Sequence, residues 1–206
     1  MAGSGTANSN SLSRIVQRYR EEDSPALQVE LGLLRMLDTE SCKQLTQDLE
    51  EFASPWEIHR ATEDLASVLP DEPGLYMFVW RPAFQFQVGS TPTHGSFPQL
   101  LYIGQAGASN TDYGNTIRQR YKDYRRFLRG DPESLWTDNE PTSRDQRLAR
   151  YLTLQPMEFW CATMQERNRI EGLEKRLIRL HNPPLNDRGR PKLRGRLGTP
   201  RSAWQS

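Results

Sequence analysis

Hydrophobic and polar residues follow two different patterns along the chain, and the change falls near residue 70. Before it, apolar residues recur at helical spacing and predict short helices over 27–37, 41–52 and 56–69. Pro70 and Pro73 then break the pattern. We therefore expect a helical N-terminal region over 11–69, preceded by a small polar tail over 1–10 that we expect to be disordered.

Beyond the boundary, short apolar runs alternate with amphipathic segments. The run Leu75–Trp80 is typical of a strand covered on both faces. Further strands are predicted over 100–103, where Gly104 is expected to end the strand, and over 157–163. Helices are predicted over 116–129, 144–154 and 165–181, and the Gly- and Pro-rich segment 81–99 predicts a loop or hairpin.

The order of these elements predicts an α+β fold over 70–186. The first two strands are too close in sequence for a helical crossover, so we expect them to pair antiparallel. The expected architecture is a small sheet of about three strands flanked by helices. The remaining residues, 187–206, hold too few apolar groups to fold alone, and we expect a basic, flexible tail there.

Charge is divided unevenly along the chain, although the total is only +1. Residues 1–73 carry six basic and fourteen acidic side chains, residues 74–186 carry fifteen and eleven, and residues 187–206 carry six and one. The basic C-terminal two-thirds is suited to contact with phosphates. A solvated acidic region beside an ordinary basic face explains the charge equally well.

Composition excludes several classes of protein. No apolar run is long enough to span a bilayer, and the N-terminus lacks the basic start and apolar core of a secretory signal. Cys42 and Cys161 form no paired framework, which fits a reducing cytoplasm and excludes a multi-cysteine zinc module. The three histidines, His59, His94 and His181, are too far apart in sequence to form a metal-ligand motif.

Two tripeptides carry a resemblance to a known family. The segment 69–76 reads LPDEPGLY and the segment 101–106 reads LYIGQA, which resembles the two halves of the GIY-YIG nuclease motif. Leu75 replaces the middle Ile of the first half. Gln105 stands where many members have Lys after the second half, so a cation is missing at that point.

The segments that follow are similar to the rest of the motif. In 117–124, Arg120 matches the family's catalytic Arg, and Tyr124 matches the residue one turn later on the same helix face. Arg118, the alternative, faces away from Tyr124. In 171–186, Glu174 takes the position of the metal-binding Glu and Asn186 that of the Asn.

Helical geometry supports Glu174 over Glu171 independently of the resemblance. Glu174 lies at the margin of the apolar face of its helix, whereas Glu171 points toward water. A carboxylate at such a margin is costly without a partner. That partner is either a metal ion or a neighbouring cation, Lys175 or Arg176.

The resemblance implies an endonuclease that hydrolyses DNA phosphodiester bonds with one Mg²⁺ or Mn²⁺ ion per site, held by Glu174. Arg120 would contact the phosphate. Tyr76 and Tyr102 would position the nucleophilic water, and Tyr76 would help to deprotonate it. The implied catalytic residues are Tyr76, Tyr102, Arg120, Tyr124, Glu174 and Asn186.

Other basic residues are expected to contact double-stranded DNA through its phosphates. They continue the Arg120 helix or lie in the C-terminal tail, where a solvated face or plain disorder is the alternative. These are Arg125, Arg126, Arg129, Arg188, Arg190, Lys192, Arg194 and Arg196.

The chain most resembles the stand-alone type II restriction branch of the family. It has no second nuclease domain and no cysteine-rich DNA-reading module, but it has a helical N-terminal region and enlarged loops beside the motif strands. This implies a cytoplasmic restriction-modification enzyme that works as a homodimer beside a DNA methyltransferase. The alternatives are a structure-specific nicking nuclease of repair, recombination or phage origin, and a catalytically inactive DNA-binding module.

Overall fold

The computed structural model describes residues 38–88, 91–108, 115–130, 135 and 143–186; over 83–88 and 91–94 it describes the backbone alone. Within these residues no helix is long and apolar enough to cross a membrane. The elements, in chain order, are α3 (Thr39–Phe52), β1 (Glu57–Arg60), the short 3₁₀ helix η1 (Leu65–Ser67), β2 (Gly74–Trp80), β3 (Ala83–Val88), β4 (Thr91–Ser96), β5 (Gln99–Ala106), α4 (Ile117–Leu128), α6 (Arg144–Leu152), β6 (Met157–Thr163) and α7 (Arg167–His181).

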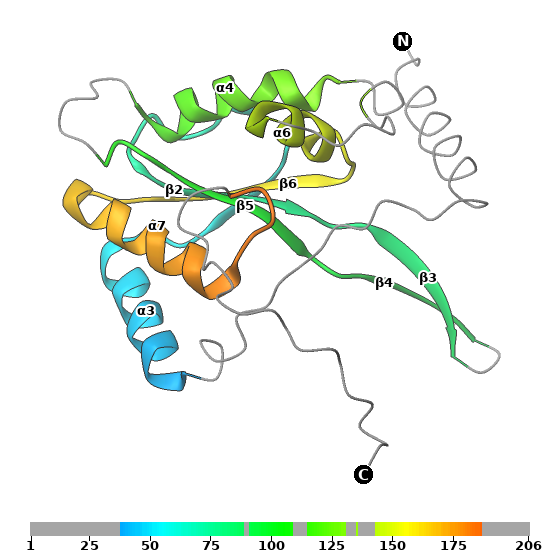
Figure 1. Ribbon diagram of the computed structural model, residues 1–206, viewed down its shortest axis with the longest axis horizontal. Helices are drawn as coiled ribbons and strands as arrows, with labels where there is room; N and C mark the ends of the chain where they lie inside the picture. Colours follow the sequence, from blue (N-terminus) through cyan, green and yellow to red (C-terminus); the bar gives the residue numbers. More distant parts are fainter. Residues whose placement is uncertain (1–37, 89–90, 109–114, 131–134, 136–142, 187–206) are drawn as a thin grey trace.

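Helices cover both faces of a four-stranded antiparallel sheet, with α4 and α6 on one side and α3 and α7 on the other (Figure 1). Alternate residues of β2 supply the two cores. Tyr76 and Phe78 pack toward α4 and α6, while Leu75, Met77 and Val79 pack toward α3 and α7. This explains the unbroken apolar run of β2, because a strand buried on both faces has no solvent side for polar residues.

The strand order in the sheet is β1-β6-β2-β5. The central strand β2 pairs with β5 along one side and with β6 along the other, and β5 is therefore an edge strand. A register shift between Phe78 and Val79 interrupts the β2–β5 ladder. Tyr76 lies opposite Gly104, and Phe78 lies opposite Tyr102, so both motif tyrosines belong to the same face of the sheet.

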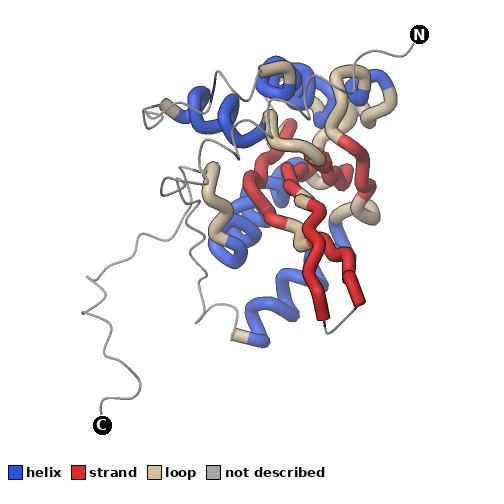
Figure 2. Tube along the Cα trace, turned by 90° about the vertical axis from the view of Figure 1, so that its right-hand side faces the viewer, coloured by secondary structure: helices blue, strands red, loops and turns tan. Residues whose placement is uncertain are grey.

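The strands β3 and β4 form a separate hairpin between β2 and β5. It projects away from the helix-covered sheet in both views (Figures 1 and 2). The segment 81–99, for which sequence allowed a loop or a hairpin, is therefore a hairpin over most of its length.

Local capping accounts for the helix bounds around the site. The Thr116 side chain accepts a hydrogen bond from the Gln119 backbone at the start of α4. Ser143 and Gln146 form a reciprocal capping box at the start of α6. At its C-terminus α7 ends at Asn182 in the left-handed conformation, with φ of 46° and Pro183 next in the chain.

The predicted α+β class and antiparallel sheet are confirmed, with two corrections. The helix expected over 56–69 is instead β1 followed by η1, because Glu57–Arg60 pairs with β6. This adds a fourth strand from the N-terminal side of the expected boundary. The strand expected to stop at Gly104 continues to Ala106. The expectations for 1–37 and 187–206 lie outside the described residues.

Candidate active site

Three tyrosine hydroxyls meet on the α4 side of the sheet. Tyr76 comes from β2, Tyr102 from β5 and Tyr124 from α4, and all three side chains are buried. The Tyr76 hydroxyl donates to the Tyr124 hydroxyl at 3.2 Å, and the Tyr124 hydroxyl donates to that of Tyr102 at 3.0 Å. A chain of hydrogen bonds thus runs from the central strand to the edge strand.

Arg144, at the start of α6, contacts the far end of this chain. Its Nη2 donates to the Tyr102 hydroxyl at 2.9 Å and to the Tyr124 hydroxyl at 2.8 Å. Its guanidinium carbon lies 5.6 Å from the centre of the Tyr102 ring. Sequence reasoning missed Arg144, because it lies outside every motif and only the packing of α6 against α4 brings it to the tyrosines.

Burial raises the pKa of Tyr76 well above 10, and the neighbouring Tyr124 and Tyr102 hydroxyls raise it further. The positive charge of Arg120 lowers the pKa of Tyr76, but this effect is smaller than each of the effects that raise it. Burial also raises the pKa of Tyr102, despite the lowering effect of Arg144. The surroundings of Tyr76 therefore favour a neutral phenol that donates a hydrogen bond, and they do not support its expected part in deprotonating water.

The positive charge of Arg120 acts on both Tyr76 and Glu174. Its charge partly opposes the rise in pKa that burial causes in both Tyr76 and Glu174. Its Nη1 is 3.9 Å from Asp123, and its Nε is buried with no hydrogen-bond partner among the described residues. A buried, unpaired donor is costly in a folded protein, and a bound anion would provide such donors with an acceptor.

Arg118, the alternative to Arg120, has a different environment. Its Nε donates to the Leu69 carbonyl at 2.8 Å, and its Nη1 lies 3.8 Å from Asp71. These contacts connect α4 to the chain that precedes β2. The predicted division of the two arginines by helix face is therefore confirmed, and the catalytic role of Arg120 stays a prediction.

The two carboxylates of α7 are also placed as predicted, with Glu174 half-buried and Glu171 exposed. Lys175 bonds to Glu171 at 2.5 Å, and Arg176 forms an ion pair with Asp48 of α3. Both cations considered as partners for Glu174 are thus engaged elsewhere. Over the ranges that the structure describes, Glu174 itself has neither an ion pair nor a hydrogen bond.

This isolation changes the acidity of Glu174. Burial, reinforced by the negative charge of Glu171, raises its pKa to about 7, although Lys175 and Arg120 act in the lowering direction. A half-buried carboxylate without a cationic partner fits a hard divalent cation, because the ion would compensate the buried charge. The donor set at Glu174 is therefore compatible with Mg²⁺ or Mn²⁺.

Both the oxygen and the nitrogen of the Asn186 side-chain amide bond to the edge of β5 that does not pair with β2. Its Oδ1 accepts from the Ile103 backbone N–H at 2.9 Å, and its Nδ2 donates to the Ile103 carbonyl at 2.7 Å. The backbone N–H of Leu185 donates to the Leu101 carbonyl beside it. Asn186 is therefore a positioning residue that pairs the segment after α7 with the strand carrying Tyr102.

The basic residues expected to extend the site along α4 differ in their surroundings. Arg126 bonds to Asp145 of α6 at 2.9 Å, and Arg129 bonds to Glu63 at 2.8 Å. Arg125 is exposed. The tail residues expected to contact DNA lie outside the described residues. DNA contact by Arg125, Arg126 and Arg129 stays a prediction, and two of these three, Arg126 and Arg129, are already paired.

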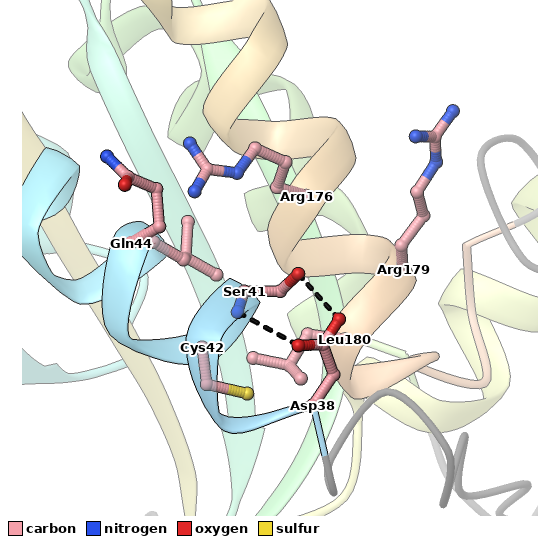
Figure 3. Close-up of a pocket in the computed structure, with 8 residues that line it drawn as sticks. Asp38, Ser41, Cys42, Gln44, Arg176, Arg179 and Leu180 are labelled. Carbon is pink, nitrogen blue, oxygen red and sulfur yellow. Dashed lines mark hydrogen bonds between the residues drawn. The ribbon is translucent and has the colours of Figure 1, made fainter.

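Two cavities differ in their relation to the tyrosines. One of about 440 Å³ lies between α4 and α6 and is lined by Arg120, Tyr124 and Arg144. A slightly larger one, of about 480 Å³, lies between the start of α3 and the end of α7, with Asp38 and Arg179 at its walls (Figure 3). The second contains no motif residue, so the cavity between α4 and α6 is the one that belongs to the candidate site.

A third group of polar residues lies at the β1–β6 pairing. One ligand atom each of Glu57, His59 and Cys161 lie within 4.8 Å of one another. Sequence spacing did not suggest this cluster, because β pairing joins residues about a hundred positions apart. Burial raises the pKa of the Cys161 thiol to about 12, and His59 already bonds to Glu57 at 3.1 Å. The cluster includes no motif residue, and its Glu57 and His59 belong to β1, at the edge of the sheet opposite β5.

Comparisons with protein-family models, with curated proteins and with solved structures give no match for this chain. Its function is therefore inferred from the geometry and chemistry of its own residues.

Proposed function

We propose that this chain is a metal-dependent DNA endonuclease with a GIY-YIG type of active site. The observation that carries the proposal is that the charge of Arg120 opposes the rise in the pKa of both Tyr76 and Glu174, so Arg120 lies near both groups. The tyrosine hydroxyls and Arg120 approach from the α4 side, and Glu174, a carboxylate without a cationic partner, comes from α7 on the other face. An anion-binding group beside a cation-binding group suits hydrolysis of a phosphodiester.

Glu174 would hold one divalent cation, Mg²⁺ or Mn²⁺. When bound there, the cation would stabilise the negative charge that develops on the phosphate and on the leaving 3′ oxygen. Its charge would also favour the ionised form of Glu174, whose pKa is otherwise raised by burial.

The remaining residues of the site bind and orient the substrate. Arg120 supplies a guanidinium whose donors have no strong partner among the described residues. Tyr102 stands at the end of the hydrogen-bond chain, where its hydroxyl accepts from Tyr124 and Arg144. Its own proton has no acceptor among the described residues, and we assign it to a phosphate oxygen or to the attacking water. Tyr76 and Tyr124 hold Tyr102 in this orientation.

Within this activity, we favour a sequence-specific restriction enzyme that acts on unmodified DNA in the cytoplasm. The support is architectural. The β3–β4 hairpin projects from the ends of the two motif strands, in a position to contact DNA beyond the cleavage site. One site per chain cuts one strand, so cleavage of both strands favours a homodimer. A DNA methyltransferase would protect the host sites.

Digestion of unmethylated DNA with the full chain, in Mg²⁺ and in EDTA, tests the proposal. We expect discrete fragments in Mg²⁺ alone, and sequencing of their ends should give one recognition sequence. Nicked circles without defined ends would show that the chain nicks single strands and is not a restriction enzyme. Intact DNA under all metal conditions would contradict the endonuclease proposal.

A further inference from the structure

The cavity between α4 and α6 opens beside Tyr124 and is lined mainly by charged residues. Arg120, Lys122 and Arg126 of α4 and Arg144 of α6 line it, together with the carboxylates Asp123 and Asp145. Four positive groups face two negative ones, so the lining carries an excess of positive charge. A concave surface of one sign concentrates the potential that attracts an anion.

The carboxylates do not neutralise these cations equally. Asp145 bonds to Arg126 at 2.9 Å. Asp123 is 3.9 Å from Arg120, which is too long for a direct hydrogen bond. Arg144 has only the neutral hydroxyls of Tyr102 and Tyr124 as hydrogen-bond partners in the part of the chain that the structure describes. Its charge is therefore oriented but not cancelled.

Arg144 lines one wall of this cavity beside Tyr124, and its guanidinium also bonds to Tyr102. A single nitrogen of Arg144, Nη2, makes both bonds to the tyrosines, and the other N–H groups of the fork have no acceptor within the described part of the chain. A guanidinium fork matches the oxygens of a phosphate.

We propose that this cavity binds a backbone phosphate of the DNA strand and that Arg144 contacts it directly. The proposal rests on the proposed endonuclease function, which it extends with a phosphate-binding residue outside the motif. It also gives α6 a function, because the helix places Arg144 at its first turn and Asp145 holds Arg126 beside it. A purely structural Arg144 would only tie α6 to the tyrosine cluster.

Binding of duplex DNA to the full chain in EDTA separates these two roles without cleavage. We would measure affinity against salt concentration for the wild type, Arg144→Ala and Arg144→Lys. Arg60→Ala is the matched control, since Arg60 is an exposed cation on β1 at the opposite edge of the sheet. Loss of one phosphate contact lowers the slope of log K against log salt by about 0.9.

We expect Arg144→Ala to lose about that much slope, and Arg144→Lys and Arg60→Ala to keep the wild-type value. An unchanged slope for Arg144→Ala would overturn the proposal. The proposal would also be overturned if Arg144→Lys lost as much slope as Arg144→Ala and had a lower melting temperature. That result would mean that Arg144 only holds the tyrosines in place. Cleavage by the wild type in Mg²⁺ is measured in parallel. If the wild type cleaves DNA and the slope of Arg144→Ala is unchanged, the phosphate-binding proposal fails while the endonuclease proposal stands.

Discussion

The ring of Tyr76 lies against the Cα of Gly104 on the neighbouring strand. A Cβ placed on Gly104 would be 2.4 Å from the Tyr76 Cζ and 2.5 Å from its hydroxyl oxygen. The two residues face each other in the β2–β5 register. The glycine of the second tripeptide therefore provides the space that the tyrosine of the first one occupies, and the two halves of the motif depend on each other sterically.

Gly104→Ala should destabilise the fold, because the added methyl must displace a fully packed aromatic ring. Overpacking of this kind costs roughly 1–3 kcal/mol of unfolding free energy. Gly172→Ala is the matched control: nothing lies within 4 Å of its added Cβ, and its place inside α7 predicts a gain of about 0.5–1 kcal/mol. Chemical denaturation of both variants measures the difference. Equal stability of the two would contradict the packing of Tyr76 on Gly104.

This relationship also shows where sequence patterns were misleading. Gly104 predicted the end of a strand, because glycine commonly interrupts strands. In the fold it is an interior strand residue, and the strand continues to Ala106. The reason for the glycine lies on another strand, 28 positions earlier in the chain at Tyr76, and the spacing of apolar residues along one strand carries no information about such a contact.

Tyr102→Phe should reduce turnover more than Tyr76→Phe. In the proposed site Tyr102 has the last hydroxyl of the hydrogen-bond chain, whereas loss of the Tyr76 hydroxyl leaves Tyr124 still bonded to Tyr102 and Arg144. Single-turnover cleavage rates in Mg²⁺ give the comparison. A far larger loss in Tyr76→Phe would instead favour Tyr76 as the general base, despite the burial that raises its pKa.

Arg120→Ala and Arg118→Ala should differ in kind. Arg120→Ala is expected to lower the cleavage rate by at least tenfold with little change in melting temperature, because its donors lack strong partners among the residues that the structure describes. Arg118→Ala should lower the stability by about 1 kcal/mol, through loss of its bond to the Leu69 carbonyl, and leave turnover largely intact. Rates and melting temperatures of both variants are the measurement. Comparable losses of rate would show that the Arg120 assignment is wrong.

The sequence predicted relationships between residues of one helix better than contacts between residues of different elements. Helical spacing predicted that Glu174 lies at the margin of the buried face of its own helix, and that Arg120 shares a helix face with Tyr124. Arg144 was missed because its partners are on β5 and α4, and nothing in its own segment marks it. The strand at Glu57–Arg60 was missed for a similar reason: its pairing with β6 determines its conformation.

Glu174→Gln should stabilise the metal-free chain at alkaline pH. The folded-state pKa of Glu174, about 7, lies above its ordinary value of 4.5, so the folded chain loses stability as the pH rises through this interval. Glutamine has no such ionisation, and the variant should gain roughly 1–3 kcal/mol over the wild type at pH 8 and nothing at pH 4. Melting temperatures across this range provide the test. Profiles that run parallel would contradict a buried, unpartnered carboxylate.

The central claim, that Glu174 holds the metal of a DNA-cleaving site, is tested most directly by a pair of variants on the same helix. Single-turnover cleavage in Mg²⁺ should be abolished in Glu174→Gln and largely retained in Glu171→Gln, because Glu171 is exposed and already bonded to Lys175. DNA binding should persist in both. Full activity of Glu174→Gln, or loss of activity in Glu171→Gln alone, would contradict the account.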